Sequence, residues 1–297
     1  MNTQARDGSS PLRSAVRVAE NLCGLPAVAT QDWCDRAASA LIPIVGSGVA
    51  VSMLAQVDER GVIQRQEATG VAGATVAEIT TTLGRATSAA SVIVTDPNDA
   101  GLVRVRTNLA QAHELSWTPG LLGAGAVRVG TAATLSPTPA AQSVIARRWD
   151  AIPHGPILLG ATAVGPGGRT LIVEIAPAGA NAHAGEPELA VLEAALPLLG
   201  RRAIMAIGSD PSEHAAWLTQ REQIILQHLL LGKSVREIAD ELGRSPHTVH
   251  DHVKSLHRKL NASSRGELVA RALGYVEPKP LQPEVHTATG KASTHSA

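Results

Sequence analysis

Residues 218–273 read LTQREQIILQHLLLGKSVREIADELGRSPHTVHDHVKSLHRKLNASSRGELVARAL, and they hold the clearest structural signal in the chain. Three segments, beginning at Thr219, Ser234 and Ser264, match the pattern Ser/Thr-x-x-Glu. In this pattern the hydroxyl and the carboxylate accept hydrogen bonds from otherwise unpaired N–H groups at the start of a helix. Ser245 followed by Pro246 predicts a fourth start, because Ser caps helices and Pro suits the first helical position. The stretch therefore predicts four short helices.

The predicted helix ends agree with these starts. Gly232 and Gly243 follow the first two helices and Asn261 follows the third, and both residue types adopt the left-handed conformation that ends a helix. Apolar residues of the third helix recur at helical spacing, at Val249, Val253, Leu256 and Leu260. Its opposite face carries His250, Asp251, Lys254 and Arg258. A helix with one buried stripe and one basic face can lie in the major groove of DNA.

This segment resembles a LuxR-type helix-turn-helix DNA-binding domain. The matching positions are Leu218, Thr219, Arg221, Glu222, Gly232, Ser234, Glu237, Ile238, Ala239, Leu242, Ser245, Thr248, Val249, His252, Lys259, Leu260, Ser264 and Arg265. The resemblance implies a scaffold helix over 238–242 and a recognition helix over 246–260. It implies that Thr248 and Lys259 contact the phosphate backbone. The full set of expected DNA-binding residues is Ser245, Thr248, His250, Asp251, Lys254, Arg258 and Lys259.

The recognition helix departs from the family pattern. His250 holds a position that is commonly Lys or Glu, and Asp251 puts an acid on the docking face, which indicates an altered target and some pH sensitivity. His247 and Asp251 share a face with i,i+4 spacing, so a metal site is an alternative interpretation. The helix register explains these residues without a metal, and we predict none.

Composition limits the remaining classes. The chain has 297 residues with 26 basic and 26 acidic side chains, which excludes a uniformly basic protein. Residues 218–273 hold nine basic and six acidic residues, which gives this module a net charge of +3. The rest of the chain has a net charge of −3, so the total is zero. Two cysteines exclude a disulfide-rich scaffold. We find no signal peptide and no apolar run of about 18 residues, and we expect a cytoplasmic protein without membrane contact.

The N-terminal region predicts an α+β domain. Two hairpins are expected, from 48–57 with 62–68 and from 157–164 with 170–175. Helices are expected over 31–41, 102–115, 140–149 and 188–205. Hairpins joined through helices favour an antiparallel sheet with helices packed on it, and the order loosely resembles GAF- or PAS-type sensor domains. Trp33, Trp117 and Trp149 are weak candidates for lining an effector pocket, and the alternative is that they fill the core.

Other functional motifs are missing from this region. We find neither the residue set of a phosphoacceptor receiver domain nor a Walker lysine, and the region lacks the Tyr that the autoinducer-binding domain of some LuxR-type regulators uses. A Cys–His pair could be drawn from Cys23 and Cys34 with His113, His154 and His183, but no spacing demands it. We predict no catalytic site and no cofactor.

Five segments are predicted: a flexible N-terminus (1–11), a sensor or dimerisation domain (12–187), a linker helix (188–217), the helix-turn-helix domain (218–275) and a disordered tail (276–297). Pro197 should kink or end the linker helix, which serves either as a dimer seam or as an ordinary packed helix. The chain is predicted to be a homodimeric transcription regulator that binds double-stranded DNA. RNA polymerase and a small-molecule effector are further candidate partners. The alternatives are an enzyme or a protein-interaction adaptor that carries an accessory helix-turn-helix.

Overall fold

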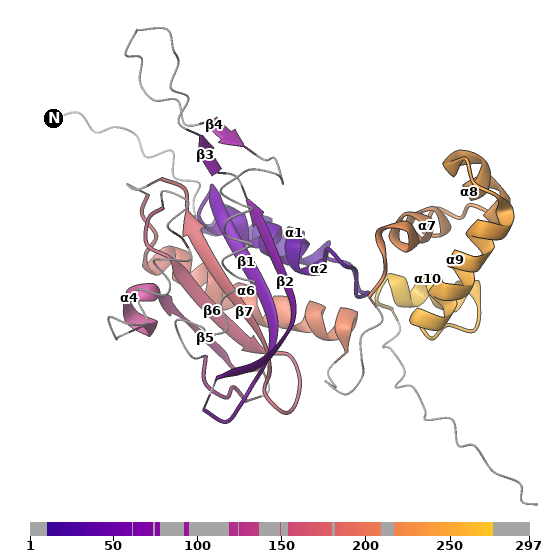
Figure 1. Cartoon of the computed structure of the whole chain (residues 1–297). Coiled ribbons are helices and arrows are strands. Elements are labelled where there is room, and N and C mark those ends of the chain that lie inside the picture. Colours follow the sequence, from indigo (N-terminus) through magenta and orange to yellow (C-terminus); the bar gives the residue numbers. More distant parts are fainter. Residues whose placement is uncertain are drawn as a thin grey trace, which may run out of the picture.

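The computed structural model describes residues 11–60, 62–73, 75–77, 92–94, 119–123, 125–136, 149, 154–179, 182–208 and 217–275. They form an N-terminal part built on a β-sheet and a C-terminal part built of helices (Figure 1). The expected helices over 102–115 and 140–149 lie outside the described residues, Trp149 excepted, and so does the expected tail over 276–297.

The described strands form one main antiparallel sheet. Its strands are β1 (Gly48–Val57), β2 (Ile63–Gly73), β5 (Val127–Thr131), β6 (Leu158–Ala163) and β7 (Arg169–Pro177), in the order β2-β1-β7-β6-β5. Every neighbouring pair is antiparallel, and both predicted hairpins, β1–β2 and β6–β7, are confirmed. Two short strands, β3 (Thr75–Ala77) and β4 (Val92–Val94), pair separately.

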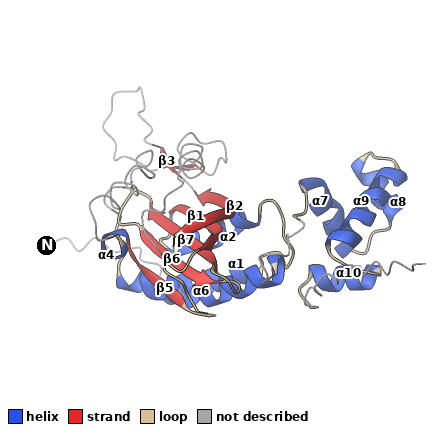
Figure 2. Cartoon of the chain, turned by 60° about the horizontal axis from the view of Figure 1, so that its bottom comes forward, coloured by secondary structure: helices blue, strands red, loops and turns tan. Residues whose placement is uncertain are grey.

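Helices cover one face of this sheet (Figure 2). They are α1 (Pro11–Cys23), α2 (Trp33–Leu41), which continues into the 3-10 turn η1 (Ile42–Ile44), and α6 (Glu186–Ile207). Because strand side chains alternate between faces, Ala50 and Leu54 of β1 join the core under the helices, whereas Val51 and Met53 point to the other face. The α+β architecture expected for this part is confirmed. Helix α1 was not anticipated; it begins where a flexible N-terminus was expected to end.

A second apolar cluster occupies the opposite face of the sheet, where the short helix α4 (Ala132–Leu135) also lies. It includes Trp149, whose Nε1 donates to Oε2 of the buried Glu174 at 2.9 Å. Trp33 belongs to the first cluster, and its Nε1 donates to the Pro26 carbonyl. The sheet therefore separates Trp33 from Trp149, so they do not line one pocket together, and Trp117 lies outside the described residues.

Helix α6 covers residues that the sequence assigned to a linker. It continues past Pro197 to Ile207, so of the two outcomes expected at that proline, a kink or an end, the end is wrong. Side chains on one of its faces are buried, at Val191, Leu192, Ala195, Leu196, Leu199, Ala203 and Ile207. The helix is therefore part of the N-terminal core rather than a free connection.

The C-terminal part contains α7 (Gln220–Leu230), α8 (Val235–Leu242), α9 (Pro246–Lys259) and α10 (Arg265–Ala272). These bounds confirm the four predicted helices. Their buried faces enclose a core of their own, to which Ile225, Ile238 and Leu268 contribute with 0–3% of their surface exposed.

Candidate nucleic-acid interface

Helix α9 is the candidate recognition helix, and local sequence fixes both of its ends. Ser245 Oγ accepts a hydrogen bond from the Thr248 N–H at 3.1 Å, and Pro246 occupies the first turn. The preceding helix α8 ends at Gly243, whose left-handed φ of 59° lets the chain turn sharply into α9. After α9 the chain turns again at Asn261, with φ of 48°. The turn chemistry expected from the sequence is confirmed at each of these positions.

One face of α9 anchors it to the domain. Val249 and Leu256 are 1% and 0% exposed, and they pack into the core formed with α7, α8 and α10. Burying two branched side chains of this size contributes roughly 3–6 kcal/mol. The same contacts fix the rotation of α9 about its axis, and this rotation determines which side chains face solvent.

The other face of α9 is open to solvent. His247 and Lys254 expose 83% and 66% of their side chains, and Asp251 between them exposes 56%. Asp251 carboxylate oxygens lie 3.6 Å from His247 Nε2 and 4.0 Å from Lys254 Nζ. His250 and Arg258 are exposed on this face as well. The structure thus brings together the predicted residues His250, Asp251, Lys254 and Arg258 on one face of α9. His247 lies on the same face, as its i,i+4 spacing from Asp251 indicated.

The two remaining predicted residues that lie near the start of α9 are also exposed. Ser245 and Thr248 sit at its N-terminal turn, with 2.8 Å between their hydroxyl oxygens. A helix N-terminus with free N–H groups favours a phosphate. The contact of Ser245 and Thr248 with a DNA backbone stays a prediction.

Lys259 differs from the expectation. Its Nζ donates to Glu222 Oε2 at 2.7 Å and to the Trp217 carbonyl at 2.8 Å, and only 19% of its side chain is exposed. This ammonium group faces the start of α7 instead of the open face of α9. The ammonium group forms an internal ion pair in this structure, and the phosphate contact expected from the resemblance stays a prediction.

The Glu222 carboxylate accepts hydrogen bonds from residues at the start of α7 and on α9, and so links the two helices. Its Oε2 accepts from the Thr219 N–H at 2.8 Å, and its Oε1 accepts from Ser255 Oγ of α9 at 2.7 Å. Burial alone would raise the pKa of Glu222, but the hydrogen bonds from Lys259, Thr219 and Ser255 outweigh burial and hold the pKa at about 2. The carboxylate is therefore charged throughout the physiological range and joins the two helices.

A capping box fixes the start of α8, whereas at the start of α10 the expected box is incomplete, because the Glu267 carboxylate bonds to Ser263 and not to the N-cap residue Ser264. Ser234 Oγ accepts from the Glu237 N–H at 3.3 Å, and the Glu237 carboxylate accepts from the Ser234 N–H at 2.7 Å. At the start of α10, Glu267 accepts from the Ser263 hydroxyl and N–H and from Arg271, and these bonds lower the pKa of Glu267 to about 2.

The helical domain is attached to the N-terminal part through the segment 25–31 (Figure 1). The Leu218 N–H donates to the Ala29 carbonyl at 2.6 Å, and the Gln31 N–H donates to the Leu218 carbonyl at 3.2 Å. Val28 is buried in the core of the helical domain. Trp217 packs against the N-terminal core that lies between the sheet and its covering helices. Each part thus inserts one side chain into the apolar cluster of the other.

The described residues do not assemble the Cys–His pair. Cys34 lies in the core under the helices, where burial, followed by the nearby Asp35 charge, raises the pKa of its thiol to about 12. Cys23 is exposed, and His154 contacts Trp149 on the opposite face of the sheet. His113 lies outside the described residues. Within the described ranges, no three His, Cys, Asp or Glu side chains converge as metal ligands would, and no helix has the length and apolarity needed to cross a membrane.

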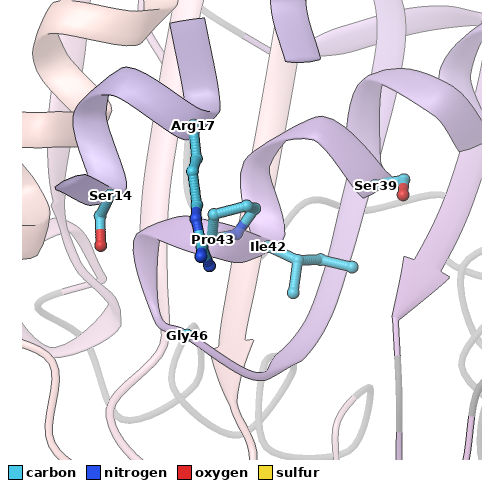
Figure 3. A pocket seen from close by; sticks show the side chains of 6 residues that line it. All are labelled: Ser14, Arg17, Ser39, Ile42, Pro43 and Gly46. Atoms are coloured by element: carbon cyan, nitrogen blue, oxygen red, sulfur yellow. The ribbon is translucent and has the colours of Figure 1, made fainter. Parts of the chain in front are cut away.

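A shallow hollow of about 250 Å³ lies between α1, α2 and η1 (Figure 3). It is lined by Ser14, Arg17, Ser39, Ile42, Pro43 and Gly46. Arg17 extends across it toward Pro43. The polar residues Ser14, Arg17 and Ser39 make up half of this lining, unlike the predominantly apolar sites that usually hold small effectors.

Comparison with known proteins identifies the helical domain. Residues 216–272 match the family described as "Bacterial regulatory proteins, luxR family". The C-terminal part of the chain is a LuxR-family helix-turn-helix domain. Its curated relatives include the transcriptional regulatory protein UhpA of Escherichia coli, 48% identical over 54 residues that make up 18% of this chain and 28% of UhpA. The probable transcriptional regulatory protein NarL of Mycobacterium tuberculosis is 41% identical over 56 residues, which are 19% of this chain and 26% of NarL. The chain therefore spans about a quarter of the length of these relatives.

Solved structures give only loose overall superpositions. SdiA in complex with octanoyl-rac-glycerol aligns over 89% of this chain and 93% of that one, with 15% identity and a TM-score of 0.33. The phage VqmA–DPO complex aligns over 42% of this chain and 52% of that one, with 27% identity and a TM-score of 0.21.

Proposed function

We propose that this protein is a transcription regulator that binds double-stranded DNA, with helix α9 in the major groove. The division of α9 into two faces carries the proposal: Val249 and Leu256 are buried, while cationic and hydrogen-bonding side chains line the open side. A helix held in this way can offer donors and acceptors to base edges. The LuxR-family match of residues 216–272 supports the same function.

The exposed residues divide into two roles. Ser245 and Thr248, at the helix start, contact phosphates, and Arg258 neutralises a phosphate farther along the helix. His250, Asp251 and Lys254 face the bases, where Lys254 donates to guanine acceptors and Asp251 accepts from the amino group of cytosine. Asp251 carboxylate oxygens lie 3.6 Å from His247 Nε2 and 4.0 Å from Lys254 Nζ, so the three side chains lie next to one another on this face before DNA binds.

The N-terminal domain acts as the regulatory part in this proposal. Its antiparallel sheet, covered by helices on one face, supports the proposal of a GAF- or PAS-like sensor, and the segment 25–31 connects it to the start of α7. A change in the N-terminal core can therefore move the helix-turn-helix domain as a unit. A small-molecule effector regulates DNA binding if it prefers one arrangement of the two domains. The protein acts in the cytoplasm as a homodimer and meets RNA polymerase at its target promoters.

Selection from genomic DNA tests the proposal. Full-length protein is incubated with genomic fragments at several salt concentrations, and the bound fraction is sequenced. The expected result is an enriched, two-fold symmetric site whose affinity falls steeply with salt, because each neutralised phosphate contributes a slope of about −0.9 in log–log form. A Lys254→Ala variant should reduce this slope by about one or weaken the site by about 1–3 kcal/mol. Binding that neither selects a sequence nor depends on salt would refute the proposal.

Asp251 favours a second candidate, a protein-interaction adaptor. Its carboxylate lies between His247 and Lys254 and reduces the positive charge of the face. The same selection distinguishes the two functions, because an adaptor would leave every genomic fragment unenriched. An Asp251→Asn variant that gains salt-dependent binding would identify the carboxylate as the cause.

A further inference from the structure

Helix α1 carries an apolar stripe that faces solvent. Leu12 and Val16 are 73% and 49% exposed, and Ala19 and Cys23 continue the line as exposed residues. Their spacing of four, three and four residues repeats every seven residues, as in the seam of a coiled coil. Helix α1 already has a separate buried side, with Ser14, Val18 and Leu22 turned into its own domain. The outer stripe is therefore not needed to pack α1 onto its own sheet.

Charged side chains flank this stripe on its outer side. Arg13 and Glu20 are exposed one position after Leu12 and Ala19, so both occupy the same flanking position of the seven-residue repeat. The structure contains no ion pair to either side chain from any residue it describes. In an antiparallel pair of identical helices, this flanking position faces itself across the seam. Arg13 of each copy would then meet Glu20 of the other.

A parallel pair lacks this complementarity. The flanking position would face the opposite edge of the stripe, which holds Ala15 and Leu22. Neither residue can pair with Arg13 or Glu20. Charge complementarity therefore favours two copies of α1 that run in opposite directions.

We infer that the stripe of Leu12, Val16, Ala19 and Cys23 binds the same stripe of a second copy of this chain in antiparallel orientation. The inference rests on the proposed function, which calls for a homodimer, and it assigns the surface that forms it. In the resulting register Leu12 faces Cys23 of the second copy, and Val16 faces its Ala19. The small Ala19 and Cys23 allow the helices to approach closely beside the larger Leu12 and Val16.

This contact is short. Helix α1 has 13 residues, about 20 Å of helix, so the seam is smaller than the roughly 1,600 Å² of a standard interface. We expect a reversible dimer in free solution that DNA stabilises, since two linked domains bind two half-sites.

Cysteine cross-linking tests the register. Full-length Leu12→Cys protein should form disulfide-linked dimers with native Cys23 under mild oxidation, because these positions face each other. Leu12→Cys combined with Cys23→Ser should not cross-link, and neither should wild type, whose two Cys23 residues lie at opposite ends of the seam. Dimerisation of wild type through Cys23, or no cross-link in Leu12→Cys, would overturn the proposed register.

Charge exchange tests the pairing independently. In sedimentation equilibrium, the full-length Arg13→Glu and Glu20→Arg variants should each have a dimer dissociation constant about tenfold higher than wild type, because each change affects two symmetric ion pairs. The double variant should return to the wild-type value. Val16→Glu should be monomeric, whereas the control Leu121→Glu, at a 53% exposed apolar residue away from α1, should dimerise as wild type does.

These measurements are made without DNA, so they separate the two proposals. A monomeric wild-type chain, an unaffected dimer in Val16→Glu, or a charge exchange without rescue would overturn the α1 interface. Sequence-selective DNA binding in the same preparation would show that the proposed function stands without it.

Discussion

Replacing Lys259 with methionine distinguishes an internal ion pair from a DNA contact. The substitution keeps the length of the side chain and removes the ammonium group that lies 2.7 Å from Glu222 Oε2. Lowering the Glu222 pKa from 4.5 to about 2 corresponds to roughly 3 kcal/mol of stabilisation of the charged form. Three groups share this effect, of which Lys259 is the charged one. We therefore expect Lys259→Met to reduce the free energy of unfolding by about 1–3 kcal/mol.

Urea unfolding followed by circular dichroism, with hydrogen exchange of the α7 and α9 amides, measures this loss. The matched control is Lys254→Met, which removes an ammonium group 66% exposed on the open face of the same helix. The control should change stability by less than about 0.5 kcal/mol and weaken DNA binding, by about 1–3 kcal/mol through the lost base contact or by about one unit of salt slope. The opposite pattern, with a stable Lys259→Met that loses one unit of salt slope, would refute the internal role of Lys259.

Three further predictions follow from the described contacts. Gly243→Ala should cost about 1 kcal/mol, because φ of 59° is unfavourable for a residue with a Cβ atom, and urea denaturation should show a lower midpoint. Val28→Ala should leave a cavity in the helical domain and lower the protection of the α7 amides in hydrogen exchange by roughly 30-fold, or about 2 kcal/mol, although Val28 belongs to the N-terminal part. Acid should destabilise the helical domain as pH falls from about 4.5 toward 2. The reason is that Glu222 and Glu267 have folded pKa values of about 2, below their unfolded values. In an acid titration, Glu222→Gln should make the free energy of unfolding depend less on pH.

The C-terminal domain could be predicted closely because local chemistry encodes it. Thr219, Ser234 and Ser264 each bond to groups three residues ahead, and Gly243 ends a helix through its own backbone conformation. Such signals lie within a few residues of sequence. The exposed face of α9 followed from the same periodicity, because burial of Val249 fixes which residues lie opposite.

The internal ion pair of Lys259 could not be predicted from such local signals. Its partner Glu222 is 37 residues earlier in the chain, and only the packing of α9 on α7 brings the two together. From the sequence alone, a lysine at the end of a basic helix looks like a phosphate contact. The resemblance implies that role, whereas the fold shows the ammonium group bound to Glu222 and to the Trp217 carbonyl.

In the N-terminal part, the two hairpins, the helices over 31–41 and 188–205 and the antiparallel sheet could be predicted, but their packing could not. Alternating strand residues indicated β1, β2, β6 and β7, but not which face each tryptophan would occupy. The sequence therefore left open whether Trp33 and Trp149 line a pocket or fill the core, and the structure places them in two separate apolar clusters. Helix α6 is apolar enough to suit either a dimer seam or a core. Its burial depends on the sheet beneath it, which no local pattern specifies.

The central claim is that the open face of α9 reads DNA bases, and a change of specificity tests it most directly. Wild type and a His250→Ala, Asp251→Ala double variant are each used to select sites from the same genomic fragments. The account predicts that the enriched sequence changes at two symmetric positions, while the spacing between half-sites is unchanged. An identical enriched sequence for both proteins would contradict it.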